Sequence, residues 1–262
     1  MQLSISNIAW DGNHDEKIYE YMKKYGYTGL EIAPTRVFTE RPYEDLVKAH
    51  EWQTTFFKQT HFVVPSMQSI WYGRQEKVFG TLEERKILLN YTKKAIDFAK
   101  TIQCKNLVLG CPKNRVLPDG MNEQEGVKFF KELSDYAYTQ GTVIGMEANP
   151  PIYGTNYIND TVSALELIKQ VESEGFMLNL DVGTMIQNKE PVEVLEGYAQ
   201  VINHVHISEP GLKIVEKRMI HQELASFLKE NEYRGFVSIE VGRQDDIRRI
   251  EDMLCYVKEI FG

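Results

Sequence analysis

The chain has 262 residues, 42% of them hydrophobic and 26% charged, and its 38 acidic and 30 basic side chains give it a formal charge of −8. This composition is ordinary for a globular protein, and its acidity argues against a nucleic acid as partner. No run approaches the roughly 18 apolar residues of a membrane span, and the start, MQLSISNIAW, lacks the pattern of an export signal. We therefore expect a cytoplasmic protein that binds neither nucleic acid nor a membrane.

Eight short apolar or β-branched runs predict strands, and an amphipathic segment that predicts a helix follows each of them. The expected strands are 2–6, 29–33, 62–68, 106–110, 142–147, 176–181, 202–208 and 235–241. The expected helices are 15–25, 43–58, 82–102, 122–140, 160–173, 192–199, 219–230 and 247–261.

The expected strands LVLG, TVIGME, FMLNLD and VSIE are almost continuously apolar, which is typical of parallel strands covered by helices. Eight strand–helix units in a chain of this length predict an α/β fold of the (β/α)8 TIM barrel type. A doubly wound open sheet is the alternative, but it usually has a glycine-rich first turn, and the first turn here is SNIAWDGNHD. No linker divides the chain, so residues 1–262 are expected to form a single domain.

Four consecutive expected strands end in a side chain that can bind a cation. These side chains are Glu147, Asp181, His206 and Glu240, at separations of 34, 25 and 34 residues, each about one strand–helix unit. A barrel would place all four at the same level around its mouth. Three carboxylates and one imidazole would repel one another there unless a divalent ion neutralised them. A single acid at a strand end is commonly a helix cap or an ion-pair partner, so the prediction of a metal site depends on the repeated spacing.

His204 and His206 lie two residues apart, so they face the same side of their strand. The later residue is closer to the mouth, and His206 is therefore the expected ligand. His204 is expected one layer deeper, either supporting the ligands or as a core histidine.

Seven segments carry a resemblance to a known family: GLEIAPT, VPSMQSIWYG, NLVLGCPKNR, MEANPPIYGTNY, LDVGT, HVHISEP and VSIEV. They resemble segments of the xylose isomerase-like TIM barrels, specifically the sugar phosphate isomerase/epimerase family that includes ketose 3-epimerases. The resemblance spans essentially the whole chain. It implies a divalent metal held by Glu147, Asp181, His206 and Glu240, with the two glutamates also acting as acid and base. It further implies a small sugar or a similar polyol carbonyl compound as substrate.

The chemistry of such a site can be derived from its residues. A metal on the carbonyl and adjacent hydroxyl oxygens would stabilise an enediolate. Glu147 and Glu240 could remove a proton from one face of the carbon and deliver one to the other, which makes an epimerase. Delivery to the neighbouring carbon would make an aldose–ketose isomerase. The alternatives are a metal-dependent lyase or dehydratase that expels water after the same enolisation, and a non-catalytic carbohydrate-binding barrel.

The ligand set of carboxylates with one imidazole favours Mn²⁺, and Mg²⁺, Co²⁺ and Zn²⁺ are compatible with it. The sequence does not specify the substrate, its phosphorylation or the oligomeric state, and a homodimer is the expected association.

Further residues are expected to contact the substrate: Gln68, Trp71, Tyr153, Lys113, Arg115, His221 and Glu31. Lys113 and Arg115 would hold a phosphate or carboxylate, or else lie on a solvated loop. His221 would orient Glu240 or meet the substrate, or else find a surface partner.

Four aromatic residues would form an apolar wall against a sugar ring, or else belong to the core: Trp71, Tyr153, Tyr72 and Trp10. Glu31 and Gln68 would bind substrate hydroxyls, and Glu209 would support the metal ligands.

Two positions depart from the pattern of the family. Many members have a histidine where this chain has Thr184, and ketose 3-epimerases tend to have a glutamate where it has Tyr153. Both departures spare the expected ligands and alter the expected substrate pocket. The identity of the sugar is therefore open, as is epimerisation against another enolising step.

Overall fold

A computed structural model describes all 262 residues of the chain. Seven strands form one parallel sheet: β1 (Gln2–Ser6), β2 (Gly29–Glu31), β3 (Asn106–Leu109), β4 (Val143–Met146), β5 (Phe176–Asp181), β6 (Ile202–Ile207) and β7 (Phe236–Ile239). Their order in the sheet is β2-β1-β7-β6-β5-β4-β3. Seven of the eight expected strands are thus confirmed, each within a few residues of its expected ends.

The third expected strand, 62–68, is wrong as a regular strand. It forms isolated parallel bridges instead, from Val63 to Gly29 and from Met67 to both Ile32 and Leu107. The segment therefore lies between β2 and β3, the two end strands of the sheet. Pro65 explains the irregularity, because a proline has no N–H to donate to a ladder of hydrogen bonds.

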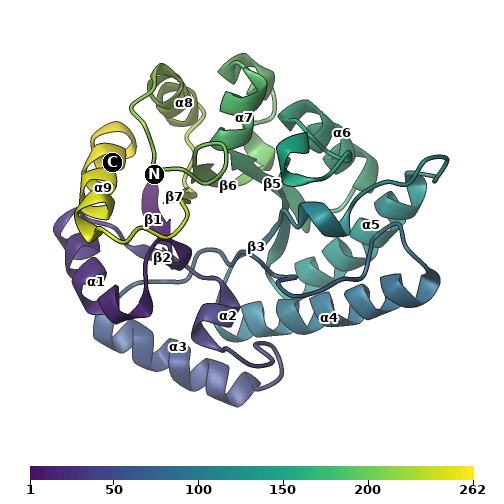
Figure 1. Ribbon diagram of the computed structural model, residues 1–262, viewed down its shortest axis with the longest axis horizontal. Coiled ribbons are helices and arrows are strands. Elements are labelled where there is room, and N and C mark those ends of the chain that lie inside the picture. The colour runs from purple at the N-terminus through teal and green to yellow at the C-terminus, as the bar shows by residue number, and fades with distance from the viewer.

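Helices surround the strands (Figure 1). The long ones are α1 (Asp15–Lys24), α3 (Leu46–Thr60), α4 (Leu82–Thr101), α5 (Gln124–Thr139), α6 (Thr161–Val171), α8 (Met219–Glu230) and α9 (Ile247–Phe261). All seven were expected. The first and last, α1 and α9, contact each other, which brings the two ends of the chain together. No helix combines the length and the apolar character that a membrane crossing needs.

Two short helices were not expected, and one expected helix is wrong. The short helices are α2 (Pro34–Val37) and α7 (Val182–Asn188), and each begins directly after or close to the end of a strand. The segment 192–199 contains 3-10 turns, Val192–Leu195 and Ala199–Val201, in place of the expected α-helix. Gly197, at a φ of 78°, interrupts the segment, because a residue in the left-handed region does not continue a right-handed helix.

The strands are buried along nearly their whole length, as the apolar runs predict. Helices such as α4 place one apolar face on them, and a capping box of Thr81 and Glu84 fixes where α4 begins. One side of the sheet also carries buried polar side chains, among them Ser4, Asn106 and Asn179. The alternation of residues along β6 puts His204 and His206 among these polar groups and Val205 on the other face.

Candidate active site

Four side chains that can bind a cation lie at the carboxyl ends of four neighbouring strands. Glu147 follows β4, Asp181 ends β5, His206 lies near the end of β6, and Glu240 follows β7. These strands are adjacent and parallel, and Asp181 is paired with His206 in register. The four side chains therefore start from the same end of the sheet.

Glu147, His206 and Glu240 converge on one point. His206 Nδ1 lies 3.1 Å from Glu147 Oε2 and 3.3 Å from Glu240 Oε2. Ligands that share one ion at about 2.1 Å lie roughly 3–4 Å apart. The three groups thus have the spacing of ligands to a single ion.

Asp181 stands beside this trio and is held by its own partners. Its Oδ2 accepts hydrogen bonds from the N–H of Thr184 at 2.8 Å and from the Thr184 hydroxyl at 2.7 Å, and its Oδ1 accepts one from Ser208. Asp181 thereby caps the start of α7. A carboxylate has about four lone-pair sites, so the cap leaves it able to take part in a metal site.

Glu31 lies on the far side of the His206 ring. Its Oε2 is 2.9 Å from His206 Nε2 and 3.0 Å from His204 Nε2. All three side chains are fully buried. Glu31 was expected to meet substrate hydroxyls, but it is sealed behind His206, where it fixes the ring and leaves Nδ1 facing the glutamates. His204 lies one layer below His206, at the depth expected for it.

The site contains several buried carboxylates and too few positive charges to neutralise them. Burial raises the pKa of Glu147, Asp181 and Glu240 above their ordinary values, and the carboxylates also repel one another. Burial opposes a charge on His206, yet Glu31 and Glu240 outweigh it and raise the His206 pKa well above its ordinary value. Three oxygen donors and one nitrogen donor in this state fit a divalent cation.

Glu147 is oriented by amides at both of its oxygens. Asn149 donates to Oε1 at 2.9 Å, and Asn179 donates to Oε2 at 2.9 Å. Asn149 had not been identified from the sequence, although its place two residues after the glutamate in the segment MEANPP was a usable signal. These bonds hold Glu147 with Oε2 toward His206 and Oε1 turned away from it.

Arg115 was expected to hold a substrate anion at the mouth, and the structure places it elsewhere. It is fully buried, and burial lowers its pKa to about 10. It donates to the Gly110 carbonyl at 2.7 Å, the Glu147 carbonyl at 3.0 Å and Asn149 Oδ1 at 2.7 Å. Arg115 therefore positions Asn149, and through it Glu147, and its donors are not directed at the mouth.

A cavity of about 340 Å³, here called the mouth pocket, opens above the trio. Glu147 and Glu240 line it, and so do four residues expected to contact the substrate: Gln68, Trp71, Lys113 and Tyr153. Ser69 and Tyr72 are also in its wall. Trp71 is almost fully buried and donates its indole N–H to Thr92, so it forms the packed side of this pocket.

Known proteins share both the sequence pattern and the fold. The profile of the xylose isomerase-like TIM barrels matches residues 19–259. The chain belongs to the xylose isomerase-like TIM barrel family. An uncharacterised protein of Methanocaldococcus jannaschii, MJ1311, is 29% identical over 138 residues, which are 49% of this chain and 47% of that protein. The match therefore spans about half of that relative.

Solved structures of other barrels superpose on nearly the whole chain. The 3-keto-D-glucoside 4-epimerase YcjR of E. coli has a TM-score of 0.79 at 19% identity, covering 99% of each chain. The D-psicose 3-epimerase of Clostridium cellulolyticum H10, solved with D-tagatose, has a TM-score of 0.81 at 14% identity, covering 100% of this chain and 99% of the other. At these identities the similarity establishes the fold.

Three other residues of the barrel lie away from the mouth pocket. Trp10 is buried and donates its indole N–H to Asp15 at 2.7 Å, so it is not part of a sugar wall. Glu209 forms an ion pair with Arg218 at 2.6 Å and does not contact the metal-binding candidates. His221, which was expected to orient Glu240 or meet the substrate, is buried in α8 with its Nδ1 2.9 Å from the Tyr256 hydroxyl.

From the burial of His221 we predict how the free energy of unfolding depends on pH under acidic conditions. Burial lowers its pKa from 6.5 to about 4, so the folded protein keeps the ring neutral at a pH where the unfolded chain protonates it. The contribution is present above about pH 6.5 and is lost as the pH falls toward 4, on the order of 3 kcal/mol in all. We expect urea unfolding of His221→Gln to depend less steeply on pH in this window than unfolding of the unmodified protein. Equal slopes would contradict the assignment.

Proposed function

We propose that the protein is a divalent-metal-dependent sugar isomerase or epimerase that uses Glu147 and Glu240 as its acid–base pair. One observation carries the proposal: both glutamates face His206 Nδ1 and both line the mouth pocket. Non-catalytic binding of a sugar needs no such pair of proton carriers. The family, and epimerase neighbours solved with D-tagatose or D-fructose, support a sugar as substrate.

Glu147, Asp181, His206 and Glu240 would hold the metal. Mn²⁺ is the ion we favour, because three carboxylates with one imidazole form a mostly hard ligand set. When bound, the ion would polarise the substrate carbonyl and stabilise the negative charge that enolisation creates.

The side chains of the chain itself would carry the protons. Glu147 and Glu240 each face His206 through Oε2. The Oε1 of each would carry the proton, and on Glu147 this oxygen keeps a second lone pair beside the hydrogen bond that it accepts from Asn149. One Oε1 removes the proton next to the carbonyl, and the other delivers a proton to the opposite face, which inverts that carbon. The raised pKa of both glutamates brings them closer to neutral pH, as such an exchange requires. Gln68, Lys113 and Tyr153 would contact the sugar from the wall.

Solvent exchange tests this proposal directly. The manganese-loaded protein is incubated in D₂O with a panel of ketoses, and the products are followed by NMR. Deuterium at the carbon next to the carbonyl, with formation of the epimer or the isomer, supports it. Loss of water would instead identify a lyase, and the absence of exchange with every sugar would indicate a binding barrel.

Removal of the metal is expected to destabilise the protein as well as to inactivate it. Without a cation, the buried carboxylates keep their mutual repulsion. An ion present at 100 times its dissociation constant adds about 2.7 kcal/mol, equivalent to a rise in Tm of roughly 5–10 °C in a domain of this size. Calorimetry with EDTA and then with added Mn²⁺ measures this shift. The variant His206→Gln should lose most of it, and an undiminished shift in that variant would place the metal elsewhere.

A further inference from the structure

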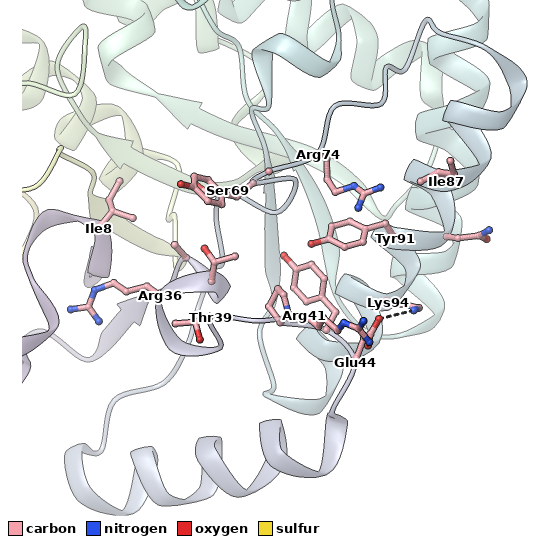
Figure 2. Close-up of a pocket in the computed structure, with 17 residues that line it drawn as sticks. Ile8, Arg36, Thr39, Arg41, Glu44, Ser69, Arg74, Ile87, Tyr91 and Lys94 are labelled. Carbon is pink, nitrogen blue, oxygen red and sulfur yellow. Dashed lines mark hydrogen bonds and ion pairs between the residues drawn. The ribbon is translucent and has the colours of Figure 1, made fainter.

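A second and larger cavity, here called the side cavity, lies next to the mouth pocket. It has a volume of about 1010 Å³. Ile8 lines it just after β1, Ala33 and Arg36 just after β2, and Tyr91 and Lys94 from α4 (Figure 2). The side cavity is therefore built at the same end of the barrel as the candidate site.

The two cavities adjoin each other. Ser69 and Tyr72 line both of them. The mouth pocket alone, at about 340 Å³, is at the lower end of the roughly 300–1,000 Å³ that small-molecule sites span. A substrate that reacts between Glu147 and Glu240 and exceeds the mouth pocket would extend past Ser69 toward the side cavity.

The charged lining of the side cavity is mostly basic. It contains Arg36, Arg41, Arg74 and Lys94 against one acid, Glu44. Two of the cations already have partners of their own outside the lining. Arg36 is paired with Asp15 at 2.5 Å, and Arg74 donates from Nε to Glu76 at 3.0 Å while its guanidinium lies over the Tyr91 ring.

Arg41 and Lys94 have only Glu44 between them. Arg41 lies 3.2 Å from one Glu44 oxygen, and Lys94 Nζ lies 3.6 Å from the other, beyond hydrogen-bond distance. The three side chains gather in one corner of the side cavity (Figure 2). Within the lining of the side cavity, this corner therefore holds two cations against one acid, with N–H donors free for an oxyanion. Asp97 lies beside Lys94 in the wall of a separate, smaller cavity.

We propose that the substrate carries an acidic group, a phosphate or a carboxylate, which binds between Arg41 and Lys94 while its sugar carbonyl lies in the mouth pocket. This inference rests on the proposed function and names its substrate class. Arg41 would supply a planar pair of donors and Lys94 a point charge, a combination that suits the oxygens of either group. Glu44 would then compete with the substrate for both cations.

The test compares three probes that share a ketose frame: D-fructose, D-fructose 6-phosphate and D-fructuronate. Their binding to the protein is measured by calorimetry, and kcat/KM by solvent deuterium exchange. We expect at least one acidic probe to bind about tenfold more tightly than D-fructose, as a charge-assisted hydrogen bond provides. The phosphate and the carboxylate probes distinguish the two sources of the anion. Equal binding of all three probes would overturn the proposal.

Variants assign the preference to residues. Lys94→Gln and Arg41→Gln should each reduce the ratio of acidic to neutral probe affinity, and Glu44→Gln should increase it. Lys93→Gln is the matched control, because Lys93 is next on the same helix but pairs with Glu132. If Lys113→Gln removes the preference and Lys94→Gln does not, the anion lies in the mouth pocket and the proposal is wrong.

The binding measurement needs no turnover. Preferential binding that depends on Lys94 would therefore support the side cavity as the anion site even if no probe exchanged deuterium. In that case the proposed function would fail and the anion site would stand.

Discussion

Glu240→Gln is expected to lower sugar turnover by roughly 10²- to 10⁴-fold, the range for loss of a general acid or base, while the fold stays intact. The amide keeps the shape of the side chain and an oxygen that can face His206, but it neither accepts nor releases a proton near neutral pH. Glu240 contacts the site only at its own end of β7, so its substitution leaves the sheet in place. Steady-state kinetics, together with circular dichroism and metal analysis, check both halves of the expectation.

Deuterium exchange from solvent distinguishes the roles of Glu147 and Glu240. In a two-base epimerase the remaining glutamate can still remove the proton of one epimer and return a deuteron to the same face. Glu240→Gln should therefore exchange one epimer without inverting it, and Glu147→Gln should exchange only the other. The control is Glu216→Gln, a change at an exposed partner of Arg218. Full activity in Glu240→Gln, or exchange of the same epimer by both variants, would contradict the two-base assignment.

Most of the features that bring the candidate site residues together could be predicted from the sequence. The separations along the chain predict that four side chains lie on neighbouring strands: Glu147, Asp181, His206 and Glu240. The parallel sheet aligns the ends of those strands and so brings the side chains to the same level. The depth of each histidine in the barrel could also be predicted, because His204 and His206 face the same side of β6 and His206 is nearer the end of the strand. Such features follow from backbone geometry alone.

Features that depend on side-chain partners were harder to derive. Arg115 is in a loop whose composition suggests solvent, and only the folded chain brings the carbonyls of residues 110, 147, 157 and 158 around it. The strand spacing predicts Asp181 as a ligand, but it does not predict the second role of Asp181 as the cap of α7. The sequence offered the signal, since an N-cap aspartate accepts from the residue three positions on, here Thr184.

Glu31 shows the same difficulty and gives the second large prediction. Glu31→Gln is expected to weaken metal binding by about 10- to 100-fold, the usual effect of removing the partner that orients a ligand histidine. It should also lower the free energy of unfolding by about 3–5 kcal/mol, because the buried charge on His206 then loses the carboxylate that faces it. Burial opposes the charge on Glu31, but the facing imidazoles outweigh it and lower its pKa, so the charged form is the one that the fold stabilises. Calorimetric titration with Mn²⁺ and urea unfolding measure the two effects.

A buried carboxylate away from the site provides the matched control. Glu209 is almost fully buried and paired with Arg218, so Glu209→Gln should also destabilise the protein but leave the affinity for Mn²⁺ unchanged. If both variants lose stability and only Glu31→Gln loses metal affinity, Glu31 acts by fixing the ring of His206. Unchanged metal affinity in Glu31→Gln would mean that packing alone orients this ring. The sealed carboxylate would then be a structural group with no influence on the site above it.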